Sequence, residues 1–173
     1  MVYRQQQIRS MTKLEKSIST SKTDLYRLLN TQIESLLANE RDFIANAANF
    51  CSLIYHTLPD LNWTGFYIHK NGILILGPFQ GKPACVRIEI GKGVCGKAAE
   101  IQKTVVVENV HEFPGHIACD PQSNSEIVIP IIHENNLIGV LDLDSPVFCR
   151  FDAKDQTGLE ALVQSFITLT DCK

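Results

Sequence analysis

The hydrophobic residues of this chain follow two different repeats, and the change between them separates helical from extended segments. Apolar side chains recur every three or four residues over 24–37 and 42–56, which predicts two helices or one kinked helix. The same repeat returns between Leu159 and Ile167, and Asp152 is expected to cap the start of that helix. Short apolar or alternating runs between these regions predict about six strands, at residues 62–70, 72–79, 86–90, 104–110, 125–133 and 136–145.

Helices at both ends of the chain, with the strands between them, predict an α+β fold. We expect an antiparallel sheet with the N- and C-terminal helices packed on one face, plus a short helix at 91–102. The first two strands are expected to form a hairpin with its turn at Lys70-Asn71. Residues 1–20, in which basic side chains outnumber acids, are interpreted as a flexible basic tail, and 21–173 as a single domain.

Composition and charge narrow the classes of function. The chain has 173 residues and a net charge of −3, so it offers no basic excess for nucleic acid or for an anionic membrane. No apolar run approaches the roughly 18 residues of a membrane span. Six cysteines without a secretory signal pattern predict a cytoplasmic protein with catalytic, metal-binding or packed thiols, rather than a secreted disulfide framework.

An aromatic pair lies on one face of the first predicted strand. Side chains alternate along a strand, so Trp63, Gly65 and Tyr67 should point the same way. The glycine between the two rings would leave a gap about one side chain wide. An apolar group of a ligand, such as a methyl, could occupy that gap. An ordinary aromatic core pair beside a strand glycine explains the same pattern.

Acidic residues gather on the last predicted hairpin. Asp142 and Asp144 share a face, about 7 Å apart along their strand. A three-residue loop, 134–136, would put Glu126 opposite Asp144, so that three carboxylates converge. A loop of two or four residues without a bulge would turn Glu126 to the other face.

These acids have two interpretations. The ordinary one is the solvated outer face of an antiparallel sheet. However, no cation lies near them in the sequence, and like charges placed together raise the pKa of at least one member. Such a cluster suits a cationic amine ligand, a metal ion or a proton donor.

Three cysteines occur in settings that differ from an ordinary core. Cys95 follows glycines near a predicted helix start, where the helix dipole would stabilise a thiolate, and Cys119 lies in a long loop. A zinc site could join Cys85, Cys95 and Cys119 to His111 or His116, but no CxxC pair supports it. A redox relay needs only one thiol to attack and a second to trap the product, and suits this set better. A core-only set is the third possibility.

Six motifs together resemble the free methionine-(R)-sulfoxide reductase family of single GAF-domain enzymes: NWTGFYI, LILGPFQGKPAC, GKGVCGKAA, PGHIACD, SEIVIPI and GVLDLDS. The resemblance covers roughly residues 25–170, and it is specific because sensor GAF domains lack three cysteines in these contexts. It implies a GAF fold, a homodimer, and reduction of free L-methionine-(R)-sulfoxide to L-methionine as part of defence against oxidative stress. No bound cofactor or metal is implied, and the thioredoxin/NADPH system would be the external reductant.

The resemblance also assigns roles to the cysteines. Cys119 matches the attacking cysteine, and Cys85 the main resolving cysteine. Cys95 can also form a disulfide with Cys119 in this scheme. Dipole reasoning alone would instead make Cys95 the nucleophile, and we follow the family match.

The remaining matched positions are implied to bind substrate. Trp63 and Tyr67 match a pocket for the terminal methyl group. The acids match residues that hold the ammonium group and polarise the sulfoxide. The full implied binding set is Trp63, Tyr67, His116, Ile117, Ala118, Glu126, Asp142 and Asp144. The alternative function is a non-catalytic GAF domain that binds a small molecule as a sensor.

Overall fold

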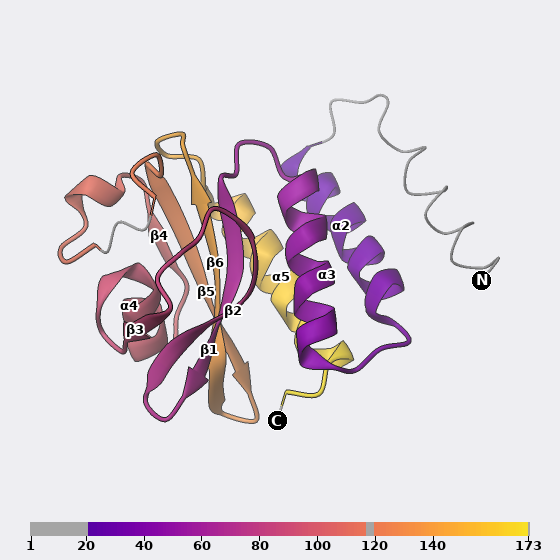
Figure 1. Cartoon of the computed structure of the whole chain (residues 1–173). Helices are drawn as coiled ribbons and strands as arrows, with labels where there is room; N and C mark the ends of the chain where they lie inside the picture. The colour runs from indigo at the N-terminus through magenta and orange to yellow at the C-terminus, as the bar shows by residue number, and fades with distance from the viewer. Residues whose placement is uncertain (1–20, 117–119, 173) are drawn as a thin grey trace.

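A single antiparallel sheet of six strands forms the centre of the molecule (Figure 1). The computed structural model describes residues 21–116 and 120–172, so the expected tail at 1–20 lies outside the described residues. The strand order is β3-β2-β1-β6-β5-β4. The strands are β1 (Trp63–Lys70), β2 (Ile73–Gly81), β3 (Arg87–Glu89), β4 (Val105–Val107), β5 (Ser125–His133) and β6 (Asn136–Ser145).

Helices cover the two faces of this sheet unequally. Three long helices lie on one face and the short α4 lies on the other (Figure 1). The helices are α2 (Lys22–Leu37), α3 (Phe43–Thr57), α4 (Gly93–Ile101) and α5 (Ala153–Leu169), with a 3-10 turn, η1 (Val110–Glu112). The prediction of terminal helices on one face is therefore confirmed. Residues 24–57 form two separate helices rather than one kinked helix.

The face under the long helices holds the larger core. Three phenylalanine rings from α3, β1 and α5 meet there, with centroids 4.9 to 5.6 Å apart: Phe50, Phe66 and Phe166. Their contacts explain the three-to-four-residue repeat of the helices and the alternation of β1. Asp152 caps α5 as predicted, since its side chain accepts hydrogen bonds from the backbone N–H groups of Lys154 and Asp155.

The two hairpin turns differ in detail from the prediction. Asn71 and Gly72 connect β1 to β2, with φ angles of 51° and 79°, so the turn lies one residue later than expected. Glu134 and Asn135 connect β5 to β6, with φ angles of 49° and 63°. Two consecutive positive φ angles are typical of the type I′ turn, whose twist matches that of the paired strands. The loop therefore has two residues rather than the three that would pair Glu126 with Asp144 without a bulge.

A bulge in β6 compensates for the shorter loop. Ile131 pairs with Gly139, but Ile132 pairs with Leu137, so Ile138 is the extra residue between the two pairs. Beyond this bulge Glu126 pairs with Asp144, as the three-residue loop would have arranged. The expected pairing of Glu126 with Asp144 is thus confirmed, but a bulge in β6 produces it rather than a longer loop.

Candidate functional site

A pocket lies between α4 and the sheet face opposite the long helices. Its walls come from β1, β3, β5, β6, α4, the connection at 82–84, and the residues His116, Asp120 and Ser123. Seven of the residues with roles implied by the sequence line it: Trp63, Tyr67, Cys95, His116, Glu126, Asp142 and Asp144. Ile117, Ala118 and Cys119 lie outside the described residues.

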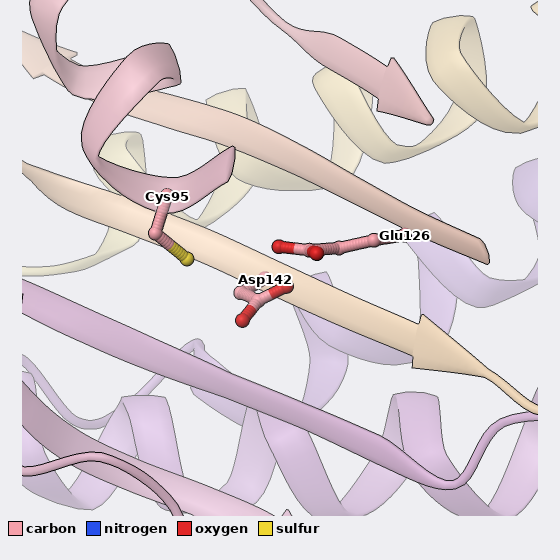
Figure 2. Close-up of side chains that lie close together, drawn as sticks. All are labelled: Cys95, Glu126 and Asp142. Carbon is pink, nitrogen blue, oxygen red and sulfur yellow. The ribbon is translucent and has the colours of Figure 1, made fainter. Parts of the chain in front are cut away.

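The three acids face this pocket because of strand pairing. Glu126 on β5 lies opposite Asp144 on β6, and Val128 lies opposite Asp142. Glu126 and Asp142 are only 5% and 6% exposed. The interpretation of a solvated outer sheet face is therefore wrong, because α4 and neighbouring loops cover it. Figure 2 shows the Glu126 and Asp142 carboxyl groups and the Cys95 thiol pointing toward one another.

Burial changes the protonation of these acids. It raises the pKa of Asp142 to about 7, although Cys95 and Glu126 partly offset this as hydrogen-bond donors. Burial also raises the pKa values of Glu126 and Asp144 well above their usual range, and the charge of Asp142 adds to both shifts. The predicted pKa increase is confirmed in direction. Loss of water contributes more to it than the repulsion between like charges does.

Cys95 differs from the sequence-based expectation. It is the third residue of α4, near the positive end of the helix dipole, but it is only 4% exposed. Burial raises the pKa of its thiol well above the usual value, and the charges of Asp142 and Glu126 add to this increase. The expected dipole-stabilised thiolate is therefore wrong. The view that Cys95 is not core-like is also wrong, since it packs in the smaller core beside α4.

Cys95, Glu126 and Asp142 are the described residues closest to a metal-binding set. Their ligand atoms lie within 4.8 Å of one another. Metal binding would require a thiolate and ionised carboxylates, whereas burial favours the protonated forms of Cys95 and Glu126. The donor set also differs from the cysteine–histidine zinc site considered from the sequence. The arrangement fits a proton-holding site better than a metal centre.

The aromatic pair forms a wall of the pocket. Trp63 and Tyr67 stack with ring centroids 5.9 Å apart, and Trp63 also stacks on Phe79 at 5.5 Å. A Cβ atom added to Gly65 would lie 2.3 Å from Cη2 of Trp63. The indole therefore fills the space over Gly65, and the predicted empty gap between the rings is wrong. A ligand would contact these rings from the pocket side.

The structure describes five of the six cysteines. Cys85 is half-buried and disulfide-bonded, which excludes the reading that all cysteines are packed core thiols. A disulfide sulfur also does not serve as a zinc thiolate. The free cysteines among the described residues are Cys51, Cys95, Cys149 and Cys172.

Charged residues that sequence reasoning missed also reach the pocket. Lys82 lines it and pairs with Asp120 at 3.1 Å, and Lys92 lines it beside the start of α4. His116, which the resemblance had assigned to the binding set, also reaches the pocket: its Nε2 lies 3.8 Å from Glu126 Oε2, and burial lowers the pKa of this histidine. No local sequence signal identifies these contacts, because the members of each pair are separated along the chain.

The sequence of this chain is similar to a known domain family and to named enzymes. The GAF domain family model matches residues 27–167. Over 156 residues, covering 88% of this chain and 94% of the relative, the sequence is 49% identical to the free methionine-R-sulfoxide reductase of Escherichia coli K12. It is 41% identical to the Saccharomyces cerevisiae protein of the same name, over 86% of this chain and 87% of that protein.

A solved structure of a similar protein extends the comparison to the fold. The free methionine-R-sulfoxide reductase of Neisseria meningitidis, in complex with its substrate, superposes with a TM-score of 0.85. It is 40% identical, and the match covers 89% of this chain and 93% of that one. This chain, with its GAF fold and its buried acidic pocket, therefore belongs to the free methionine-R-sulfoxide reductase family.

Proposed function

We propose that this chain reduces free L-methionine-(R)-sulfoxide to L-methionine. The observation that carries the proposal is the convergence of Glu126, Asp142 and Asp144, all with raised pKa values, in one pocket with an aromatic wall. Such a pocket can supply both an anion and a proton. The substrate needs both, because it carries a cationic ammonium group and a sulfoxide oxygen that leaves only when protonated.

The raised pKa values of the acids suggest how their roles in the reaction are divided. Burial favours the protonated forms of Glu126 and Asp144, which suits them to donate a proton to the sulfoxide oxygen. Asp142 has a pKa of about 7, and a nearby ammonium would favour its ionised form. We therefore assign ammonium binding to Asp142 and proton donation to Glu126 or Asp144. Trp63 and Tyr67 would contact the terminal methyl group.

The proposed redox step uses two thiols. Cys119 attacks the sulfoxide sulfur, its thiol becomes a sulfenic acid, and methionine is released with the sulfur reduced. Cys85 then condenses with that sulfenic acid, which forms one disulfide and releases one water. The disulfide-bonded state of Cys85 supports its role as the resolving cysteine. Cys95 is less suited to attack the sulfoxide sulfur, because it is buried and the pKa of its thiol is raised.

Recycling and assembly are part of the same proposal. An external dithiol of the thioredoxin class, recharged by NADPH, would reduce the disulfide by thiol–disulfide exchange. The described part of the chain contains no helix long and apolar enough to cross a membrane. We infer a homodimer, as the family resemblance implies, and a cytoplasmic location, because a chain with six cysteines, whose proposed chemistry requires thiols, suits a reducing compartment.

The test is thioredoxin-coupled NADPH oxidation with free L-methionine-(R)-sulfoxide. The (S) epimer and a peptide-bound sulfoxide serve as controls. Turnover with the free (R) form alone is the expected result. Binding of this sulfoxide by folded, reduced protein without turnover would favour the sensor alternative and overturn the proposal.

A further inference from the structure

The two aromatic side chains of the pocket wall also hold the backbone of the segment that carries Cys85. Trp63 Nε1 donates a hydrogen bond to the Lys82 carbonyl oxygen at 3.0 Å. The Tyr67 hydroxyl donates a hydrogen bond to the Cys85 carbonyl oxygen, also at 3.0 Å. Both ends of the 82–85 segment are thus anchored by side chains of one strand, β1.

Apart from the disulfide of Cys85, which is absent in the reduced protein, few contacts with the described residues hold this segment in place. It connects the end of β2 to β3 without regular secondary structure, and Pro83 lacks a backbone N–H. On its outer side Lys82 Nζ pairs with Asp120 at 3.1 Å and contacts Gln122 Oε1 at 2.6 Å. The Lys82 side chain is 58% exposed, so water screens this ion pair and weakens it. The two buried aromatic anchors are therefore stronger restraints than this ion pair.

The Tyr67 anchor is itself fixed. Tyr67 is 2% exposed and its ring stacks on Trp63, so the hydroxyl has little freedom to turn away from Cys85. Burial raises the pKa of Tyr67 far above its usual value, with the charge of Asp142 adding to the shift. The hydroxyl consequently remains a hydrogen-bond donor across the pH range in which proteins fold.

We propose that Tyr67 is a positioning residue for disulfide formation, acting through its hydrogen bond to the Cys85 carbonyl oxygen. The inference rests on the proposed function. Tyr67 would then have two roles. Its ring faces the pocket and would contact the substrate, and its hydroxyl holds the backbone of the resolving cysteine, Cys85, beside the same pocket. Condensation of a thiol with a sulfenic acid requires close approach of two sulfur atoms, and a shift of about 1 Å can slow such a step roughly a hundredfold.

The test separates disulfide formation from methionine release in the Tyr67→Phe variant, which keeps the ring and removes only the hydroxyl. Fully reduced protein is mixed with free L-methionine-(R)-sulfoxide without any reductant and is quenched over time. Released methionine is measured by chromatography. Disulfide is measured by mass after alkylation, and sulfenic acid is trapped with a 1,3-dicarbonyl reagent.

We expect the variant to accumulate trapped sulfenic acid. Relative to its own rate of methionine release, disulfide formation should be slowed about tenfold or more. Wild-type protein should convert nearly every sulfenic acid to disulfide before it is trapped. Equal trapped fractions per methionine released, in variant and wild type, would overturn the positioning role. Failure of the wild type to release methionine would instead overturn the proposed function.

Two further variants make the outcome specific. Tyr55→Phe makes the same chemical change on α3, outside the pocket, and should trap no more sulfenic acid than wild type. Pro83→Gly loosens the 82–85 segment without altering any aromatic ring, and should raise the trapped fraction as Tyr67→Phe does. Thermal unfolding of each variant checks that it is folded. A raised trapped fraction in Pro83→Gly but not in Tyr67→Phe would also overturn the role of Tyr67, since the segment would then be held by other contacts.

Discussion

Glu126 and Asp144 lie directly opposite each other on β5 and β6, although the loop joining these strands has two residues rather than the three that give this pairing without a bulge. The bulge at Ile138 restores the register. Because strand side chains alternate, a slip of one residue would have turned Glu126 into the core beneath the long helices. The bulge is therefore what brings three carboxyl groups into one pocket.

Replacing the acids one at a time should separate proton donation from ammonium binding. We expect Glu126→Gln and Asp144→Asn to lower kcat, by roughly 10²- to 10⁴-fold where the proton donor itself is lost. Asp142→Asn should mainly raise KM for the sulfoxide, since it removes the anion that pairs with the ammonium. Steady-state kinetics measure both constants. Glu89→Gln, an exposed position on β3, is the control and should change neither. A lowered kcat with unchanged KM in Asp142→Asn would reverse the assignment.

The Asp142 carboxyl should make stability depend on pH. Its pKa is raised from 3.8 to about 7 in the folded state, so between these values the folded protein keeps a proton that the unfolded chain releases. This contribution is fully present below pH 3.8 and is lost as the pH rises through about 7.

The Asp142→Asn variant tests this pH dependence, because an amide does not titrate. Its Tm, relative to wild type, should be higher at pH 8 than at pH 4, by on the order of a few degrees. Calorimetry or circular dichroism of the ligand-free proteins measures the difference. The same Tm difference at both pH values would contradict the raised pKa.

Asp155 ties α5 to the N-terminal helix, and its removal should be strongly destabilising. It is 1% exposed, accepts hydrogen bonds from the Tyr26 hydroxyl at 2.8 Å and Arg150 Nη1 at 3.1 Å, and pairs with Lys22. Asp155→Ala leaves these groups without their common partner, which should cost about 3–5 kcal/mol of unfolding free energy. Urea denaturation measures the loss.

An exposed ion pair offers the matched comparison for Asp155. Arg41 and Asp171 approach to 2.7 Å, but both side chains are more than half exposed. Asp171→Ala should therefore cost no more than about 1 kcal/mol. Similar losses for the two variants would show that burial does not determine the contribution of Asp155.

Gly158 in α5 should not tolerate even alanine. A Cβ atom added there would lie 2.2 Å from Cγ of Tyr26, well inside contact distance. Alanine favours an exposed helix by about 1 kcal/mol over glycine, but overpacking a core costs about 1–3 kcal/mol, so we expect net destabilisation. Thr157→Ala, at an exposed position of the same helix, should leave stability nearly unchanged. A Gly158→Ala variant as stable as wild type in urea would show that the Tyr26 ring moves aside.

The cysteine roles predict distinct kinetic defects. Cys119→Ser should abolish the first methionine released per enzyme, because no thiol attacks the sulfoxide. Cys85→Ser should keep that first turnover and lose recycling with thioredoxin. Single-turnover methionine release and coupled NADPH oxidation measure the two steps. Recycling of Cys85→Ser at the wild-type rate would make Cys95 the resolving cysteine, and full release by Cys119→Ser would remove the proposed nucleophile.

Local sequence determined much of the fold. The repeat of apolar residues in the helices, the alternation along β1 and the cap at Asp152 each depend on residues close together in the chain, and each is present in the structure as expected. The identities and spacing of the pocket acids also came from the sequence, since the side chains of Asp142 and Asp144 must share a face of β6.

Only the tertiary structure decided how those residues behave. The Ile138 bulge set the register of Glu126, and the Trp63 indole filled the space over Gly65. Burial under α4 disfavours the Cys95 thiolate and raises the pKa values of the acids, because removal from water depends on elements distant in the sequence. The sequence thus determined the identity and spacing of the pocket residues, and the tertiary structure determined their register, protonation and exposure.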